Sequence, residues 1–366
     1  MDYNWSIKEL DKNKNNITVM SCFSGSGGSS MGYKLNGCTV LANVEIDKKQ
    51  NLMYTKNLNP KYNYNMDIRD VVQMAKNKEL PDELYELDIL DGSPPCSTFS
   101  MAGLREKGWG KEKKFREGQK EQTLDDLFFV FGDLIKELKP KMVIGENVKG
   151  ILMGAAKEGY AEPIIKMYKS MGYYAKYITL YANKMGVPQK RGRVFFIGVR
   201  KDMCSLEHFN NTINSLVFNQ KDITFGEVRE RIPQIGREIP KDTKTRELWE
   251  LHKKGSDTSL QNAYNILTGK IGHFGDVILI SDYTSSTLKA GGTMLYDEIP
   301  NYLSKEHMVA IQSYPYDYNF IPDSNNNIKY TLGMSVPPLM TKAISEKLIN
   351  HIFKKVPFEF DTLDKW

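Results

Sequence analysis

The stretch ITVMSCFSGSGG, residues 17–28, joins an apolar run to a cluster of glycines. The run ITVMSCF (17–23) predicts a buried β-strand, because continuous apolar residues are typical of parallel strands covered on both faces. The glycines that follow let the backbone approach a bound ligand closely. The cluster does not fit the dinucleotide pattern G-x-G-x-x-G, since Ser30 occupies the sixth position. A nicotinamide oxidoreductase is therefore disfavoured.

The rest of the first 200 residues repeats the pattern of a β-rich run followed by a helical segment. Further strands are predicted at residues 39–46, 87–93, 142–147, 177–182 and 193–199. The clearest helix spans residues 123–138, where Thr123 and Asp126 form a capping-box pattern at its start. This alternation predicts an α/β fold with a mostly parallel sheet and flanking helices.

The regular pattern ends near residue 200, so the sequence predicts a second, smaller domain. Residues 201–285 are predicted to be irregular, with scattered basic residues. An amphipathic helix returns over residues 337–355, opened by Pro337 and Pro338. We therefore expect a first domain over residues 1–200, a second over 201–300 and a return to the first over 301–366.

The 366 residues have an ordinary globular composition, with 40% hydrophobic and 26% charged residues. The net charge of +5 is compatible with a polyanionic partner without establishing one. The four cysteines form no C-x-x-C pair, which argues against a disulfide framework and a zinc site. The N-terminus lacks the apolar core of a signal peptide, and no apolar run is long enough to span a bilayer. We therefore expect a cytoplasmic protein without a membrane partner.

Two acidic residues follow predicted strands, at the edge where open α/β sheets bind ligands. Glu45 ends the second strand and could accept hydrogen bonds from ribose hydroxyls. Asp67 follows a third strand and could meet an adenine amino group. Alternatively, both are solvated acids at strand ends.

The segment DGSPPCSTFS (91–100) places a cysteine directly after two prolines at the end of a predicted strand. The prolines fix the backbone ahead of Cys96, so the pattern favours a preorganised nucleophile over a buried, inert cysteine. The loop at 104–122 that follows is long, basic and contains three glycines. Such a loop is typical of a functional lid, and its charge suits phosphate contacts.

Three further charged side chains are candidates for catalysis. Glu146 ends the strand at 142–147, where a carboxylate over the sheet edge can exchange a proton with a substrate. Arg191 and Arg193 begin the last strand, and a spacing of two places both guanidinium groups on one side. The alternatives are a solvated or helix-capping glutamate and an ordinary charged start of a strand.

Together these motifs resemble the C5-cytosine methyltransferase family of bacteria and phages. FSGSGG (23–28) looks like the cofactor loop of that family, PPC (94–96) its nucleophile, ENV (146–148) its acid and QKRGR (189–193) its arginine motif. The stretches at 302–315 and 333–338 look like its ninth and tenth motifs. The match covers nearly the whole chain outside 201–285. The sequence departs from the residues usual in the family at Ser21, Ser97, Gly192 and Met334.

The resemblance implies a Rossmann-like, S-adenosylmethionine-dependent DNA (cytosine-5)-methyltransferase, which releases S-adenosylhomocysteine and uses no metal. Cys96 would attack C6 of cytosine, Glu146 would contact N3 and the exocyclic amine, and Arg193 with Arg191 would orient the base and Cys96. The first domain would hold the cofactor, through Phe23, Ser24, Gly25, Ser26, Gly28, Glu45, Ile46, Asp67, Ile68, Pro95, Leu127, Ser335 and Val336. The long basic loop and the second, target-recognition domain would hold duplex DNA, through Arg105, Lys113, Lys114, Arg116, Arg237, Lys244 and Arg246.

Such an enzyme must flip its target cytosine out of the duplex. The resemblance further implies a short target sequence, a restriction-modification or phage-protection role, a possible cognate restriction endonuclease acting on the same site, and a monomer on DNA. One alternative is a tRNA cytosine-C5 methyltransferase, because one branch of the family acts on tRNA. Another is a catalytically silent nucleic-acid-binding relative. Cys96 argues against an amino-methyltransferase, in which an aromatic residue follows the prolines.

Overall fold

The computed structural model divides the chain into two compact units. The sheet unit comprises Lys8–Leu180, Gly192–Phe218 and Thr341–Trp366, and the helical unit comprises Met1–Ile7, Tyr181–Arg191 and Asn219–Met340. The structure describes residues 2–10, 12–95, 127–153, 160–252, 259–270, 275–291 and 294–358. In this part of the chain, none of the helices combines the length and apolar character that crossing a membrane requires.

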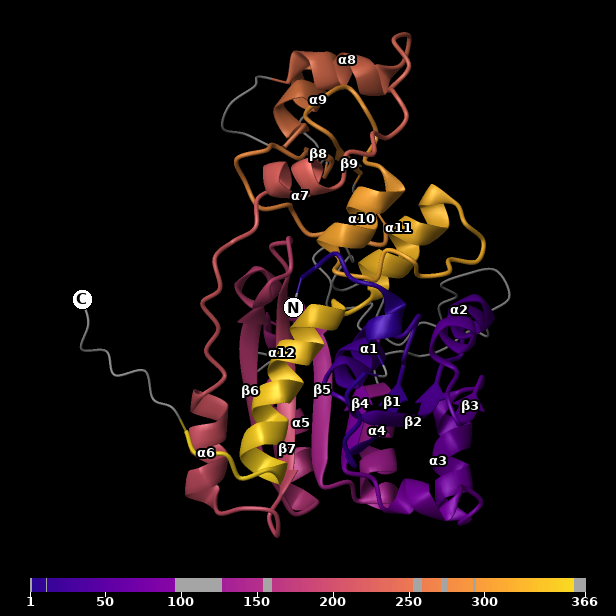
Figure 1. The fold of residues 1–366 in the computed structure, drawn as a ribbon, viewed down its shortest axis with the longest axis vertical. Helices are drawn as coiled ribbons and strands as arrows, with labels where there is room; N and C mark the ends of the chain where they lie inside the picture. The colour runs from indigo at the N-terminus through magenta and orange to yellow at the C-terminus, as the bar shows by residue number, and fades with distance from the viewer. Residues whose placement is uncertain are drawn as a thin grey trace, which may run out of the picture. The chain divides into compact units, whose positions relative to one another are not determined.

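A seven-stranded sheet with the order β3-β2-β1-β4-β5-β7-β6 forms the centre of the sheet unit (Figure 1). The pairs β2–β3, β1–β2, β1–β4 and β4–β5 are parallel, and β7 is antiparallel to β5. The strands are β1 (Thr18–Cys22), β2 (Thr39–Val44), β3 (Tyr62–Tyr64), β4 (Ile89–Gly92), β5 (Met142–Val148), β6 (Tyr173–Tyr181) and β7 (Gly192–Arg200). The predicted α/β class with a mostly parallel sheet is confirmed.

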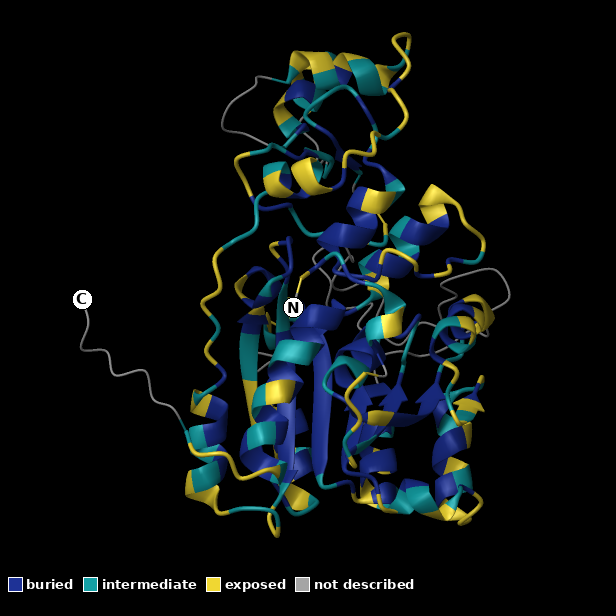
Figure 2. Ribbon diagram, viewed as in Figure 1, coloured by how far each residue is buried: buried dark blue, intermediate teal, exposed yellow. Residues whose placement is uncertain are grey.

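Helices cover both faces of this sheet, and Figure 2 shows that its strands are largely buried. The helices of the unit are α1 (Gly28–Leu35), α2 (Lys48–Leu58), α3 (Ile68–Lys76), α4 (Leu127–Leu138), α5 (Ala161–Ser170), α6 (Leu206–Asn214) and α12 (Pro338–Leu348), which starts in the helical unit. α3, α4 and α5 share one apolar cluster with alternate residues of the strands, such as Leu90 and Val143. The next residue of β4, Asp91, instead bonds to Tyr33 of α1, so α1 lies on the opposite face.

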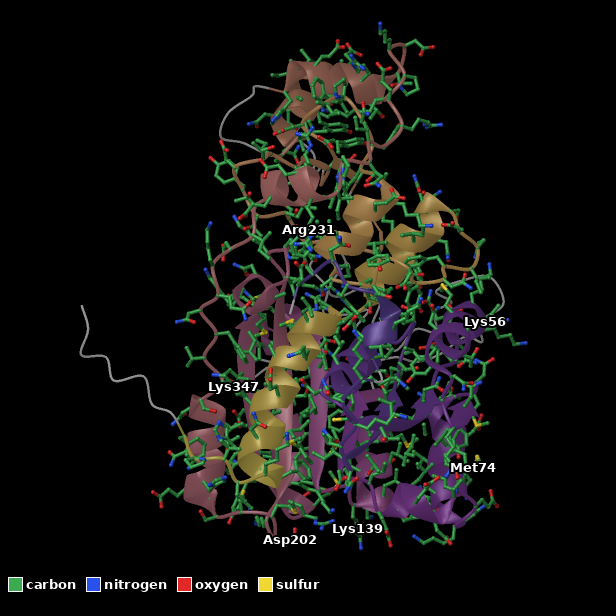
Figure 3. All side chains as sticks on the ribbon, in the orientation of Figure 1. Lys56, Met74, Lys139, Asp202, Arg231 and Lys347 are labelled. Carbon is green, nitrogen blue, oxygen red and sulfur yellow. The ribbon has the colours of Figure 1, made fainter. Side chains whose placement is uncertain are left out.

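α12 is tied to the sheet unit by polar contacts at several points. The Asn36 side chain, just after α1, donates to the carbonyl of Lys342 at 2.7 Å. Lys347, labelled in Figure 3, donates to the carbonyls of Ser215 and Val217 at 2.6 and 2.9 Å. The C-terminal helix therefore returns to the sheet although about 120 residues of the helical unit precede it.

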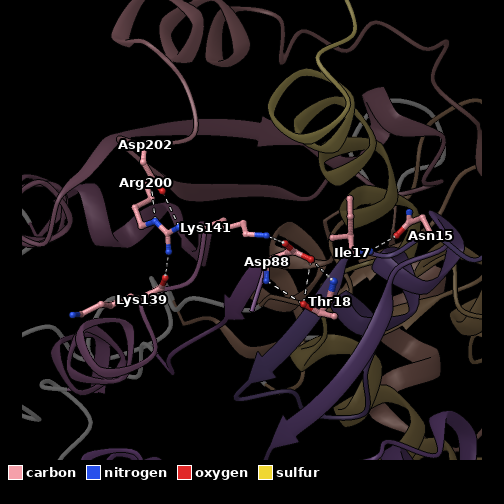
Figure 4. Close-up of polar contacts among 8 residues, drawn as sticks. All are labelled: Asn15, Ile17, Thr18, Asp88, Lys139, Lys141, Arg200 and Asp202. Carbon is pink, nitrogen blue, oxygen red and sulfur yellow. Dashed lines mark hydrogen bonds and ion pairs between the residues drawn. The ribbon is translucent and has the colours of Figure 1, made fainter. Parts of the chain in front are cut away.

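The amino-terminal edge of the parallel strands is fixed by a buried carboxylate (Figure 4). Asp88 accepts hydrogen bonds from the Thr18 backbone N–H at 2.9 Å and from the Lys141 ammonium at 2.7 Å. It thereby joins the segments that begin β1, β4 and β5. This edge contributes to stability, whereas ligands of such folds bind at the opposite, carboxyl edge.

The helical unit contains short helices and one small sheet in its described residues. Its elements are α7 (Phe225–Arg231), α8 (Lys244–Leu251), α9 (Gln261–Thr268), α10 (Lys305–Ile311), α11 (Asn325–Met334), β8 (Val277–Ile278) and β9 (Leu295–Tyr296). The prediction that residues 201–285 are irregular was wrong, because α6 to α9 lie there. The boundary expected at residue 200 falls inside the sheet unit, which runs to Phe218, and the helical unit continues past residue 300 to Met340.

Candidate active site

The glycine loop after β1 has the backbone geometry that a ligand-binding turn requires. Gly27 has φ +90°, and a Cβ there would lie 2.3 Å from a Leu58 side-chain carbon. Gly25 has φ +51°, but a Cβ there would have no neighbour within 4 Å. Its backbone N–H donates to the Glu45 carboxylate at 2.7 Å. The loop is therefore closely packed at Gly27 and open at Gly25.

Glu45 and Asp67 lie just beyond the ends of β2 and β3. Glu45 also accepts a hydrogen bond from the backbone N–H of Asp47 at 2.7 Å. Burial raises the pKa of the Glu45 carboxyl to about 7, although the hydrogen bonds from the Asp47 and Gly25 backbone act to lower it. Asp67 caps α3 by accepting from the Arg69 N–H at 2.9 Å and pairs with the Arg69 guanidinium at 3.2 Å. Asn65 links the two strand ends, since its side chain donates to the Glu45 carbonyl at 2.7 Å.

A further buried carboxylate, which the sequence motifs do not indicate, is Asp91 of β4, whose partners lie on β1 and α1. Asp91 is 3% exposed and accepts hydrogen bonds from the Ser21 hydroxyl at 2.9 Å and the Tyr33 hydroxyl at 3.0 Å. Burial raises the pKa of Asp91 to about 7; the two hydroxyls oppose this rise, and the charge of Glu146 adds to it. The pattern DGSPPC indicates only its cysteine, because the pairing of Asp91 with Ser21 depends on the register of β4 against β1.

Glu146 and Arg193 form an ion pair of 2.9 Å between β5 and β7. Antiparallel pairing sets Glu146 opposite Phe195 and Val148 opposite Arg193, so the two charged residues are diagonal neighbours. Their side chains are 10% and 13% exposed. Burial lowers the pKa of the Arg193 guanidinium, and the Glu146 carboxylate opposes this effect. The predicted acid and one predicted arginine therefore meet in a largely desolvated pair.

Asn147 connects this pair to the segment that precedes Cys96. Its side-chain amide donates to the carbonyl of Pro94 at 3.2 Å, and its oxygen accepts from the Val148 N–H at 2.8 Å. The bond fixes the end of β4 relative to β5, next to Pro95. Cys96, Ser97 and the whole basic loop at 104–122 lie outside the described residues.

The comparisons with known proteins agree on one family. The family model for C-5 cytosine-specific DNA methylases matches residues 17–350. The chain belongs to this family. It is a DNA (cytosine-5) methyltransferase, as the sequence motifs predict.

Relatives of this methyltransferase include several bacterial Type II methyltransferases. It is 29% identical to M.NgoFVII of Neisseria gonorrhoeae over 348 residues, which cover 91% of this chain and 86% of the relative. It is 34% identical to M.Bsp6I of Bacillus sp. (strain RFL6), where the match covers 53% of this chain and 55% of the relative.

Solved structures share the fold of this methyltransferase. A protein encoded within an E. coli prophage, described as a DNA modification methyltransferase, superposes with a TM-score of 0.63 at 21% identity. The match covers 92% of this chain and 99% of that protein. S. pombe Dnmt2 methyltransferase gives a TM-score of 0.56 at 16% identity, with 94% and 100% covered.

Arg191 of the methyltransferase is placed differently from Arg193. It precedes β7 and belongs to the helical unit, so the expected shared row of two strand arginines is not formed. Its guanidinium, 1% exposed, donates to the carbonyls of Leu288, Gly333 and Ser335 at 3.0, 3.0 and 2.8 Å. The arginine motif therefore joins the tenth motif within the helical unit.

The remaining predicted cofactor residues lie in three settings. Ile68 and Leu127 are buried in the apolar cluster of the sheet unit, beside the partly exposed Phe23. Ser335 and Val336 belong to the helical unit, where the Ser335 hydroxyl bonds to that of Tyr314 at 2.5 Å. Ser24, Ser26 and Gly28 belong to the glycine loop, and Ile46 lies just after the end of β2.

The predicted DNA-contacting residues that the structure describes differ in whether a carboxylate pairs with their positive charge. The Arg246 guanidinium pairs with Glu250 at 2.7 Å and with Glu238 at 3.2 Å. Lys244 is exposed at the start of α8. The Arg237 guanidinium lies over the Tyr302 ring, 5.3 Å from its centroid. Arg105, Lys113, Lys114 and Arg116 lie outside the described residues.

Proposed function

We propose that this methyltransferase transfers the methyl group of S-adenosylmethionine to C5 of a flipped-out cytosine, within a specific short sequence of duplex DNA, through a covalent bond between Cys96 and C6. The observation that carries the proposal is the desolvated Glu146–Arg193 pair at the carboxyl end of β5, which the Asn147–Pro94 hydrogen bond links to the segment before Cys96. A carboxylate and a guanidinium held in this way suit a base that must be protonated and oriented.

The residues at the ends of β1, β2 and β3 fit an adenosine cofactor. The open space at Gly25 admits a ligand close to the backbone, and Glu45 is held beside it by the Gly25 N–H. A carboxylate at this strand end suits ribose hydroxyls, because each of its oxygens can accept more than one hydrogen bond. In this proposal Asp67 would accept a hydrogen bond from the adenine amino group. When bound, S-adenosylmethionine supplies an electrophilic methyl group.

The residues of the chain make cytosine reactive toward that group. The Cys96 thiolate adds to C6, which raises the electron density at C5. Negative charge develops in the ring, and a proton held by Glu146 at N3 offsets it. Arg193 keeps Glu146 in place and adds positive potential. After C5 is methylated, loss of the C5 proton and departure of the Cys96 thiolate restore the aromatic ring.

The relatives support a proposal for the biological setting. We propose a restriction-modification or phage-protection role, since relatives such as M.NgoFVII are Type II methyltransferases. A cognate endonuclease would then act on the same sequence, with the methyltransferase working as a monomer on cytoplasmic DNA. The helical unit, with the loop at 104–122, would contribute the contacts that select the target sequence and the phosphate contacts that hold the DNA.

Labelled-methyl transfer to mixed-sequence duplex DNA tests this proposal, with Cys96→Ser as the matched variant. We expect wild type to form 5-methylcytosine at one short sequence and Cys96→Ser to form none. Binding of S-adenosylhomocysteine to both proteins controls for folding. Transfer to bulk tRNA but not to duplex DNA would replace DNA with tRNA as the substrate. No transfer to either would leave a nucleic-acid-binding relative without catalysis.

A further inference from the structure

A groove of about 430 Å³ lies entirely within the helical unit, and none of the residues that line it is assigned above to catalysis. Its floor is apolar, formed by Leu288, Leu303 and Met308 among others. Its rim carries Arg237, Lys329 and the exposed amides of Asn325 and Asn326. A groove of this kind offers apolar surface below and hydrogen-bond donors above.

Arg237 is held at this rim by its backbone. Residues 236–239 run antiparallel to 300–302, with the Tyr302 N–H donating to the Arg237 carbonyl at 2.9 Å. The Asn301 side chain donates to the carbonyl of Gly236 at 2.7 Å, and a Cβ on Gly236 would lie 1.9 Å from the Tyr302 carbonyl oxygen. The close approach of the two segments therefore fixes the start of the Arg237 side chain, and the Tyr302 ring supports its guanidinium.

Lys329 comes to the same groove from α11. Its ammonium is 3.1 Å from the Met294 sulfur, and burial lowers the pKa of Lys329 while the charge of Asp276 opposes this effect. Within the described ranges, no carboxylate lies within ion-pairing distance of Lys329 or Arg237. The helical unit contains four other arginines, and three of them, Arg229, Arg231 and Arg246, do pair with carboxylates.

The groove also differs in charge from a larger pocket of the same unit. The lining of that pocket, of about 570 Å³, includes four acids, Glu227, Glu230, Asp282 and Asp297, together with Arg229 and His307. The groove has no acidic residue among those that line it. The groove therefore suits an anion, because it offers two cations without carboxylate partners and two amides, and its lining contains no acid.

We propose that this groove binds the sugar–phosphate backbone of DNA, with phosphates contacted by Arg237 and Lys329 and the sugars over the apolar floor. The proposal rests on duplex DNA being the substrate. It adds Lys329, Asn325 and Asn326, none of which the sequence motifs indicate, to the DNA-contacting residues. Because phosphate contacts carry no sequence information, the groove would strengthen binding to every sequence equally.

The test is the salt dependence of duplex binding, measured by fluorescence anisotropy from 50 to 250 mM KCl. We expect the double variant Arg237→Gln/Lys329→Gln to bind both target and non-target duplexes about 10- to 100-fold more weakly at 0.1 M salt. The slope of log K against log salt should fall by about 2, since each lost phosphate contact removes about 0.9. The charge-keeping variant Arg237→Lys/Lys329→Arg should retain most of the slope.

The matched control is Lys184→Gln/Lys221→Gln, which removes two charges from the same unit. Lys184 pairs with Asp222 at 2.7 Å and Lys221 with Glu227 at 3.8 Å, so these charges are already matched. An equal loss of slope in the control would overturn the groove assignment, because net charge alone would then explain it. Arg237→Gln by itself, at an exposed position, should lower the slope by about 1 if the double variant does not fold.

Failure of the groove and failure of the proposed function give different results. If wild type methylates duplex DNA and the double variant keeps the full slope, the groove inference alone is wrong. If wild type neither binds nor methylates duplex DNA, the substrate assignment is wrong and the groove inference falls with it.

Discussion

The single residue Asp91 makes the stability of the sheet unit depend on pH. Its pKa is raised from the usual 3.8 to about 7, so the folded state binds a proton more tightly than the unfolded state. The contribution of Asp91 to stability is therefore greatest below about pH 4 and falls as pH rises to 7, by up to about 1.4 kcal/mol per pH unit. Asp91→Asn keeps the shape without the charge. We expect its stability relative to wild type to increase with pH between 5 and 8.

Urea denaturation at several pH values measures this difference. The neighbours of Asp91 do not obscure it, because burial raises the pKa values of Cys22, Tyr33 and Tyr54 above their usual values, so they stay uncharged in this range. Glu146 is present in both proteins. A difference in unfolding free energy that is the same at pH 5 and pH 8 would show that Asp91 does not titrate there.

The Arg193 side chain allows a second prediction at this scale. Removing one partner of a desolvated ion pair leaves the other charge uncompensated. We expect Arg193→Met to lower kcat for methyl transfer by about 10²- to 10³-fold, the range for loss of one preorganised electrostatic group. The dissociation constant of S-adenosylhomocysteine should stay within about threefold of wild type, since Arg193 is not among the proposed cofactor contacts. An equal loss of cofactor binding would contradict a role in orienting the base.

At the scale of one element, two glycines of the loop at residues 23–28 have different roles: Gly27 is needed for packing and Gly25 leaves room for a ligand. Gly27→Ala places a methyl group against Leu58 and Tyr54 at a left-handed φ, and we expect a loss of about 2–4 kcal/mol of stability. Gly25→Ala meets only the backbone strain, about 1 kcal/mol, but fills the open space beside Glu45. It should therefore weaken cofactor binding far more than it lowers Tm. Calorimetric titration with S-adenosylhomocysteine and thermal unfolding of both variants measure the two effects, and identical profiles would be evidence against this division.

Elements also show where sequence patterns predict structure and where they do not. Buried parallel strands give continuous apolar runs, so β1, β2, β4, β5 and β7 were located within a few residues. The helices after residue 200 were missed because α6 to α9 have seven to nine residues each, too few for a clear apolar period. Their caps were available as a signal, since Thr224 and Glu227 form a complete capping box.

The site divides in the same way. Glu146 and Arg193 were identifiable because their sequence motifs name them. Asp91 and Asn147 were not, because their partners, Ser21 and Pro94, are set by the register of neighbouring strands. Sequence spacing does not specify which residues of two strands become neighbours, whereas the paired sheet does.

At the scale of the whole molecule, Arg191 joins three distant parts of the chain within the helical unit. Its guanidinium donates to carbonyls at residues 288, 333 and 335, and a lysine has neither the planar fork nor the number of donors to replace it. The Ser335 carbonyl keeps a second donor, the Gln312 side chain at 2.8 Å, whereas those of Leu288 and Gly333 depend on Arg191. Since buried carbonyls without donors each cost about 1–3 kcal/mol, we expect Arg191→Lys to destabilise the protein by about 2–5 kcal/mol.

Urea denaturation measures this loss, and Arg200→Lys is the matched control. Arg200 likewise donates to a carbonyl, that of Lys139 at 2.6 Å, and makes a bidentate bond to Asp202. These bonds are exposed, so the replacement of Arg200 should cost less than about 1 kcal/mol. Equal costs for the two variants would mean that the carbonyls around Arg191 find other donors. A large cost for Arg191→Lys alone would show that the first arginine of the motif serves the integrity of the helical unit.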